Sequence, residues 1–198
     1  MKTLKTLFAA ALTAVVLTSS AFTTFASEPV VQSAVNTSGI NKIWVSGNVK
    51  IVLTQGENEG VKGTDTYNAE KTSVSKQGQT LYINSMESSQ VTLNVTVADL
   101  QRIEAYGQSV VVTSNNFDVK YLQLFLNQSA TAKIKTTAGS LYTVIKDDAS
   151  LKISGTADQS TMVASNMKNV KLNDFATLKS EQFVSEKMMN AERIALAK

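Results

Sequence analysis

Residues 141–153 read LYTVIKDDASLKI, an apolar segment followed by a turn-forming cluster and a second short segment of alternating residues. Similar units lie on both sides of it. Their turn-like clusters begin at residues 107 (GQS), 127 (NQSA), 147 (DDAS) and 166 (NMKN), so successive clusters start 20, 20 and 19 residues apart. A period near 20 residues with two short strands per period is typical of a β-solenoid, in which each coil buries its inner face only against its neighbours.

Upstream of this region, apolar and polar residues alternate in shorter runs, which is the period of a half-buried strand. Residues 43–53 alternate on either side of Gly47-Asn48, and this arrangement predicts a β-hairpin. Residues 74–83 repeat the scheme around Gly78. Residues 91–97, VTLNVTV, give the cleanest alternation in the chain. The sequence therefore predicts β-hairpins and strands before the stack of coils.

Periodicity alone leaves a second architecture open. An antiparallel meander with evenly spaced turns would give a similar pattern, because roughly 8 to 12 residues between strands is also normal in β-sandwiches. The final segment, residues 186–198, is rich in Met, Ala, Glu and Lys, which favours a helix locally. We nevertheless expect a terminal strand there.

The N-terminus has the pattern of a secretory signal. Lys2 and Lys5 precede an apolar run over residues 7–17, and small residues follow it. The run is too short for a membrane-spanning helix, which needs about 20 apolar residues. We predict a signal peptide over residues 1–26, a flexible leader over residues 27–38 and one domain over residues 39–198. The protein is thus expected to be exported, to the periplasm or the cell surface, without spanning the membrane after cleavage.

Composition excludes several kinds of site. The chain has no Cys and no His, which removes disulfides, thiolate or imidazole metal ligands and the Ser–His and Cys–His nucleophile pairs. Cleavage removes Lys2 and Lys5, so the mature charge is 17 − 16 = +1. No stretch concentrates Lys or Arg with interleaved aromatic residues, so we expect no nucleic-acid partner. We also expect no enzymatic activity, no cofactor and no metal.

Three segments in order resemble the head GIN domain of putative auto-transporter adhesins. They are residues 43–56 (IWVSGNVKIVLTQG), residues 78–83 (GQTLYI) and residues 91–97 running into residues 100–103 (LQRI). In place of the family's usual Gly-Ser-Gly turns, this chain has related turn sequences, such as GQS beginning at residue 107. The resemblance implies a right-handed parallel β-helix, or solenoid, of short degenerate coils of about 20 residues, preceded by the hairpins. It implies no catalytic residue.

Two groups of side chains are candidates for function. Asp147 and Asp148 are adjacent acids, and paired carboxylates occur in polysaccharide-cleaving enzymes. Asp also favours turns because its side chain bonds its own backbone, so we interpret the pair as structural. Aromatic residues are candidates for a sugar- or partner-binding surface: Trp44, Tyr106, Tyr121 and Tyr142 are the preferred ones, and Phe125, Phe175 and Phe183 complete the set.

The sequence favours a non-catalytic binding or adhesion module that acts through an extended β surface on an envelope glycan or a protein. A structural or assembly component of the periplasm is the alternative, and a polysaccharide-active enzyme is a more distant one. Oligomeric state is left open.

Overall fold

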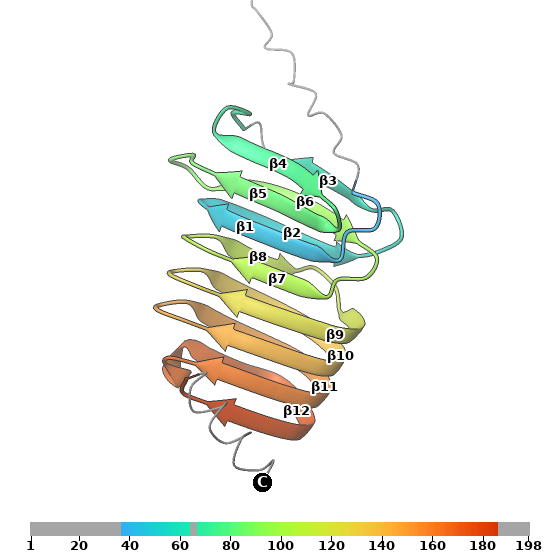
Figure 1. Cartoon of the computed structure of the whole chain (residues 1–198), viewed down its shortest axis with the longest axis vertical. Coiled ribbons are helices and arrows are strands. Elements are labelled where there is room, and N and C mark those ends of the chain that lie inside the picture. Colours follow the sequence, from blue (N-terminus) through green and yellow to red (C-terminus); the bar gives the residue numbers. More distant parts are fainter. Residues whose placement is uncertain (1–36, 64–66, 186–198) are drawn as a thin grey trace, which may run out of the picture. The chain divides into compact units, whose positions relative to one another are not determined.

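The computed structural model describes residues 37–63 and 67–185, which lie in one compact unit (Figure 1). The predicted signal peptide, almost all of the predicted leader and the predicted terminal strand over residues 186–198 lie outside the described residues. The elements are β1 (Lys42–Gly47), β2 (Val49–Gln55), β3 (Gly60–Gly63), β4 (Thr72–Gln77), β5 (Thr80–Ser85), β6 (Val91–Val97), β7 (Arg102–Ala105), β8 (Val110–Thr113), β9 (Phe117–Leu126), β10 (Thr131–Ile145), β11 (Ser150–Ala164), the 3-10 helix η1 (Met167–Asn169) and β12 (Val170–Phe183).

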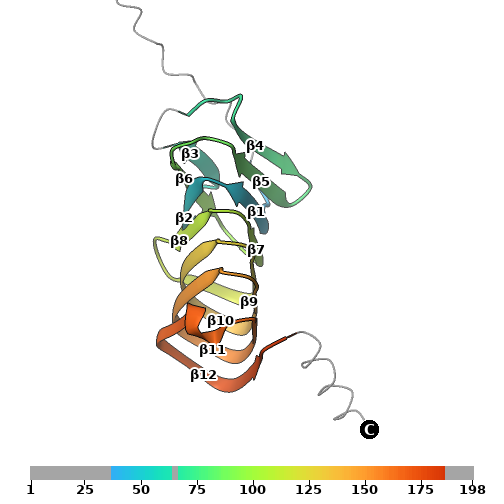
Figure 2. The same cartoon turned by 90° about the vertical axis from the view of Figure 1, so that its left-hand side faces the viewer.

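All the strands belong to one mixed sheet that curls on itself (Figure 2). The pairs β3–β6 and β4–β5 are antiparallel, and all the other strand pairs are parallel. The front wall consists of β5, β1, β7 and the second parts of β9 to β12. The back wall consists of β6, β2, β8 and the first parts of β10 to β12. The predicted all-β class is confirmed, and the parallel pairing excludes an antiparallel meander.

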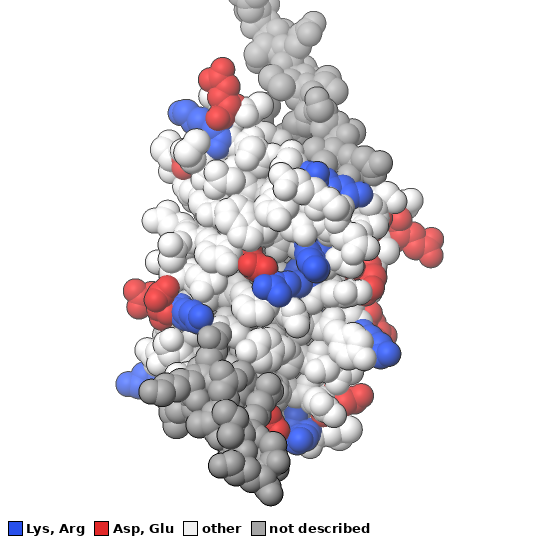
Figure 3. Space-filling view, in the orientation of Figure 1, with Lys and Arg blue, Asp and Glu red and all other residues white. Residues whose placement is uncertain are grey.

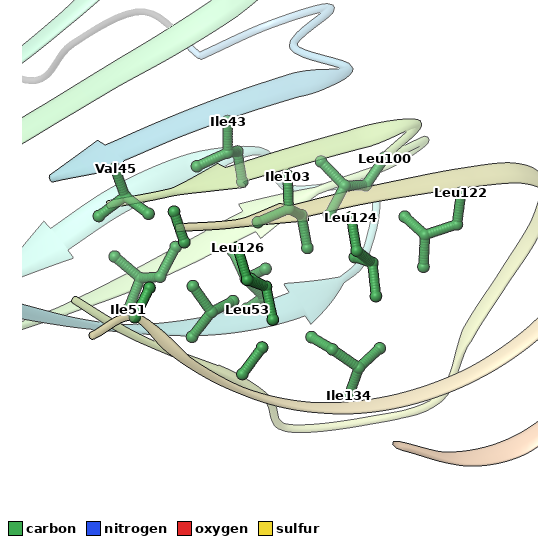
Figure 4. Close-up of a cluster of buried hydrophobic side chains, with 14 of the residues drawn as sticks. Ile43, Val45, Ile51, Leu53, Leu100, Ile103, Leu122, Leu124, Leu126 and Ile134 are labelled. Atoms are coloured by element: carbon green, nitrogen blue, oxygen red, sulfur yellow. The ribbon is translucent and has the colours of Figure 1, made fainter. Parts of the chain in front are cut away.

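The core lies between the two walls, because alternation in each strand turns one set of side chains inward. In β1, Ile43 and Val45 are buried while Trp44 between them is partly exposed. Burying each such aliphatic side chain contributes about 1.5–3 kcal/mol to folding. Figure 4 shows part of this core: Ile43, Val45, Ile51, Leu53, Leu100, Ile103, Leu122, Leu124, Leu126 and Ile134.

The hairpin predicted at Gly47-Asn48 is wrong. Strand β1 pairs with β5 and β7, whereas β2 pairs with β6 and β8, so the turn joins the two walls instead of two paired strands. Gly47 has φ +85°, and a Cβ there would lie 1.9 Å from the carbonyl oxygen of Ser85. The second predicted hairpin is confirmed, because β4 and β5 pair antiparallel around Gly78 at φ +59°.

The corner between the walls repeats along neighbouring strands of the sheet. Gly47, Gly107, Gln128 and Asp147 occupy it, all with positive φ. The backbone N–H of Gly107 donates to Oε1 of Gln128 at 2.6 Å, and the N–H of Gln128 donates to Oδ2 of Asp147 at 3.0 Å. The side chains of Gln128 and Asp147 thus each satisfy a backbone donor of the neighbouring corner. Asp147 lies in a turn, but its carboxylate bonds the backbone of Gln128, whereas the sequence context predicted a bond to its own backbone.

The repeat at this corner differs by one residue from the predicted one. Ala105 pairs with Leu126 and Leu126 with Ile145, which makes Gln128, not Asn127, the counterpart of Gly107 and Asp147. The spacings are therefore 21 and 19 residues. The error arose because Asn127 and Gln128 are both common turn residues, and only the strand register distinguishes them.

The inner residues of β11 and β12 lie in register. Leu151 pairs with Val170 and Ile153 with Leu172, in parallel. Leu151 and Ile153 are buried, but Leu172 is 43% exposed. No described strand follows β12 in the sheet, so the inner side chains of this last strand are covered on one side only.

Candidate functional site

The outer face of the front wall carries a row of side chains that the core does not use. Strand register places Trp44 beside Tyr82 of β5 on one side and beside Glu104 of β7 on the other. Glu104 in turn lies beside Phe125 of β9. All four side chains are half-buried. Four neighbouring strands therefore present one continuous row, at about 4.8 Å per strand.

Two rings of this row, Trp44 and Tyr82, form a cluster with Tyr106 beside the row. The ring centroids of Trp44 and Tyr82 are 6.0 Å apart, and those of Trp44 and Tyr106 are 5.5 Å apart. Tyr106 follows the end of β7 at the corner between the walls. We call Trp44, Tyr82 and Tyr106 the aromatic platform. Half-buried rings with polar tips are suited to stacking and hydrogen bonding with one ligand.

A charged pair lies directly beside the aromatic platform. Nε of Arg102 donates to Oε1 of Glu104 at 2.7 Å, and the Tyr106 hydroxyl donates to Oε2 of Glu104 at 3.1 Å. Burial, together with this hydrogen bond and the nearby carboxylate charge, raises the pKa of the Tyr106 phenol. The phenol therefore stays protonated and keeps Glu104 in place at neutral pH.

The row continues through Arg102 to two more rings. The Arg102 guanidinium carbon lies 4.2 Å from the centroid of the Phe125 ring, a cation–π geometry, and the Phe125 and Tyr142 centroids are 5.9 Å apart. Figure 3 shows the face on which β5, β1 and β7 lie in Figure 1. Charged groups of both signs are scattered there over a largely uncharged surface.

The structure brings together some of the predicted aromatic residues and separates another. Trp44 and Tyr106 are in contact in the platform, and Tyr142 joins the same face through Phe125. Tyr121 is 53% exposed and its ring lies 5.2 Å from the ammonium of Lys120, outside the platform. Of the wider set, Phe175 is partly buried against the core and Phe183 is buried.

Sequence reasoning missed Tyr82, Arg102 and Glu104. A signal was available for Tyr82, which stands between Leu81 and Ile83 as Trp44 stands between Ile43 and Val45. Parallel pairing of these two similar triplets places the two aromatic residues side by side.

The described residues offer no group of three or more acidic side chains that could hold a metal ion. Asp148, the neighbour of the turn residue Asp147, is exposed. Within the described part of the chain, no helix has the length and apolar character needed to cross a membrane.

Comparison with known proteins points to one family. The family model described as "Putative auto-transporter adhesin, head GIN domain" matches residues 39–185. No curated protein matches the chain.

Several solved structures share the fold. An adhesin-like protein of Bacteroides fragilis, described as a putative adhesin, superposes with a TM-score of 0.64 at 17% identity over 72% of this chain and 70% of its own. Two proteins of Parabacteroides distasonis are also similar. One, described as a putative lipid binding protein, has a TM-score of 0.56 at 14% identity over 75% and 76% of the two chains. The other, described as a putative adhesin, has a TM-score of 0.55 at 14% identity over 73% and 74%.

Proposed function

The chain belongs to the head GIN domain family of putative auto-transporter adhesins, and from that membership we propose that it is an exported, non-catalytic binding module. Its partner is an envelope or extracellular glycan or protein, bound on the outer face of the front wall. Family membership supports the adhesive role. The solenoid resemblance supports the choice of surface, because stacked-coil proteins bind along their faces.

The observation that carries this proposal is the aromatic platform with its fixed charged pair. Trp44 packs against two tyrosines on a face that the core does not require. Glu104 accepts hydrogen bonds from both Arg102 and Tyr106, so its geometry is set before any ligand arrives. Rigid rings and preorganised polar groups lower the entropy cost of binding, which is the property expected of a recognition surface.

The test uses the intrinsic fluorescence of Trp44, the only tryptophan in the chain. A glycan array would identify ligands, and their titration should change the Trp44 emission because the ligand covers the indole. Trp44→Ala should weaken binding about tenfold or more, as is usual for a central aromatic contact. The bound glycan should keep its chain length after prolonged incubation, since we propose no catalysis.

Tyr121→Ala is the matched control, because Tyr121 is an exposed aromatic residue outside the platform. This variant should bind as the parent protein does. A ligand that binds without altering Trp44 emission, or equal losses in the two variants, would remove the platform from the proposal. Shortening of the glycan would point instead to a polysaccharide-active enzyme.

We further propose that the curled sheet is a right-handed parallel solenoid with coils of about 20 residues. The 19-residue offset between β10 and β11 supports this proposal, as do the parallel strand pairs, whose crossovers are nearly always right-handed. An experimental structure with a left-handed path between β10 and β11 would contradict it.

A further inference from the structure

The back wall carries a groove that the proposed function does not use. Its volume is about 620 Å³. Residues from β2, β8, β10, β11, η1 and β12 line it, and none of them is acidic. Five are lysines, in a protein whose basic and acidic residues are nearly balanced: Lys50, Lys133, Lys152, Lys168 and Lys171.

Three of these lysines occupy the same position in consecutive coils. Lys133 of β10 pairs with Lys152 of β11, and Lys152 pairs with Lys171 of β12, all in parallel register. We call these three residues the lysine ladder. Their side chains are exposed, and they stand about 4.8 Å apart from strand to strand. None of the three forms an ion pair with another described residue.

Such a ladder is unfavourable for the isolated protein. Like charges directly opposite each other on adjacent strands repel, so each step destabilises the sheet. Lysines do protect sheet edges from aggregation, but Lys133 and Lys152 lie on strands that have neighbours on both sides. Edge protection therefore explains only Lys171. An anionic ligand that bridges the ladder would relieve the repulsion.

We propose that this groove binds a linear anionic polysaccharide, at a site separate from the aromatic platform. A concave surface lined with one sign of charge focuses its field and attracts ligands of the opposite sign. Hydroxyl groups add neutral partners, since Oγ1 of Thr131 and Oγ of Ser150 lie 3.2 Å apart in the lining. A regular row of lysines fits a polymer with repeated carboxylate or sulfate groups. No aromatic residue lines the groove, so it offers no stacking for nucleic-acid bases.

The experiment measures binding of polygalacturonate and dextran sulfate to the purified protein by calorimetry at several salt concentrations, with neutral dextran as the blank. We expect binding to both anionic polymers, and weaker binding as salt increases because counterions are released. Lys133→Gln combined with Lys152→Gln should lower the affinity about tenfold or more and flatten the salt dependence. The thermal unfolding midpoint should not fall and should rise slightly, because both side chains are exposed and the substitutions remove the repulsion between them.

Lys71→Gln combined with Lys120→Gln removes the same charge from exposed positions outside the groove and serves as the control. This variant should keep the parental affinity, and so should Trp44→Ala. Equal losses in the two double variants would show that net charge alone attracts the polymers and would overturn the proposal. So would the absence of binding at low salt, or tighter binding to phosphatidylglycerol vesicles or duplex DNA than to either polysaccharide.

Discussion

Two buried threonines in β10 differ in a single hydrogen bond. Thr136 and Thr143 are both fully buried. Oγ1 of Thr136 donates to the carbonyl oxygen of Phe117 at 2.8 Å, whereas Oγ1 of Thr143 has no partner among the described residues. A buried hydroxyl without a partner costs about 1–3 kcal/mol in desolvation.

Thr143→Val should therefore raise the free energy of unfolding by about 1 kcal/mol, because valine fills nearly the same volume without the unpaired hydroxyl. Thr136→Val should lower it by a similar amount, since a satisfied hydrogen bond is lost. Urea denaturation of the two variants measures both changes. Destabilisation of equal size in the two variants would mean that Thr143 has a partner such as buried water.

Ile153 and Lys152 are neighbours in β11 with opposite orientation. Ile153 is fully buried, with β10 and β12 on either side of its strand, so Ile153→Ala should cost about 2–5 kcal/mol in unfolding free energy, because the flanking strands cannot close the cavity. Lys152 is exposed, and Lys152→Ala should change stability by less than about 0.5 kcal/mol. Chemical denaturation compares the two. Equal losses of unfolding free energy in the two variants would contradict the assignment of Ile153 to the inner face and Lys152 to the outer face.

The orientation of single side chains was the part best predicted from sequence. Alternation is a local property, and it correctly separates the buried Ile43 and Val45 from the partly exposed Trp44 on the opposite face of the strand. The neighbours of Trp44 in the site depend on which strands pair, which is a long-range property. Tyr82 and Glu104 lie 38 and 60 residues from Trp44 in the sequence. The similar triplets around Trp44 and Tyr82 link those two residues, but no local pattern links Glu104 to Trp44.

At the scale of the elements, a glycine inside β11 shows how closely the backbones of adjacent strands approach. Gly155 in β11 has φ +107°, and a Cβ there would lie 2.0 Å from the carbonyl oxygen of Thr136 in β10. Gly78, in the β4–β5 turn, has φ +59° but open space around it. Substitutions at Gly78 therefore report backbone strain alone, whereas substitutions at Gly155 report strain together with steric contact between adjacent strands.

Gly155→Ala should lower the free energy of unfolding by about 3 kcal/mol or more, because strain and a clash with backbone combine. Gly78→Ala carries only the left-handed backbone penalty of about 1–2 kcal/mol. Thermal and urea denaturation of both variants provide the measurement. Similar losses of unfolding free energy in the two variants would show that β10 and β11 move apart easily at Gly155.

The hairpin wrongly predicted at Gly47-Asn48 is a corner between the two walls. A glycine-asparagine pair between alternating segments satisfies the rules for a hairpin, and Gly47 does adopt positive φ. The same backbone conformation serves a corner between two walls. What decides between them is the set of parallel partners available to β1 and β2, since each finds two in other parts of the chain.

For the molecule as a whole, export remains a prediction. The basic start and apolar run predict that a signal peptidase removes residues 1–26. N-terminal sequencing of protein recovered from the cell envelope should begin near Ser27. Envelope material that still begins at Met1 would contradict the prediction.

The net charge of the whole molecule did not reveal the lysine ladder. A mature net charge of +1 and the absence of any local basic run indicated that the chain has no electrostatic footprint for nucleic acid. The lysine ladder is spread over residues 133–171, with one lysine every 19 residues, so no short window contains it. That spacing equals the coil repeat of β10 on β11, and it becomes a surface feature only through parallel register.

The uniform 19-residue offset between β10 and β11 has a consequence for how such a protein evolves. Fourteen residue pairs keep this offset, from Thr131 with Ser150 to Ile145 with Ala164. In the proposed solenoid each coil packs chiefly on its immediate neighbours, so a tandem gene duplication of this length would add a coil without requiring a new kind of interface. It would also extend the row of outer side chains by one step. The length of the outer surface is then a trait that selection could adjust by recombination alone.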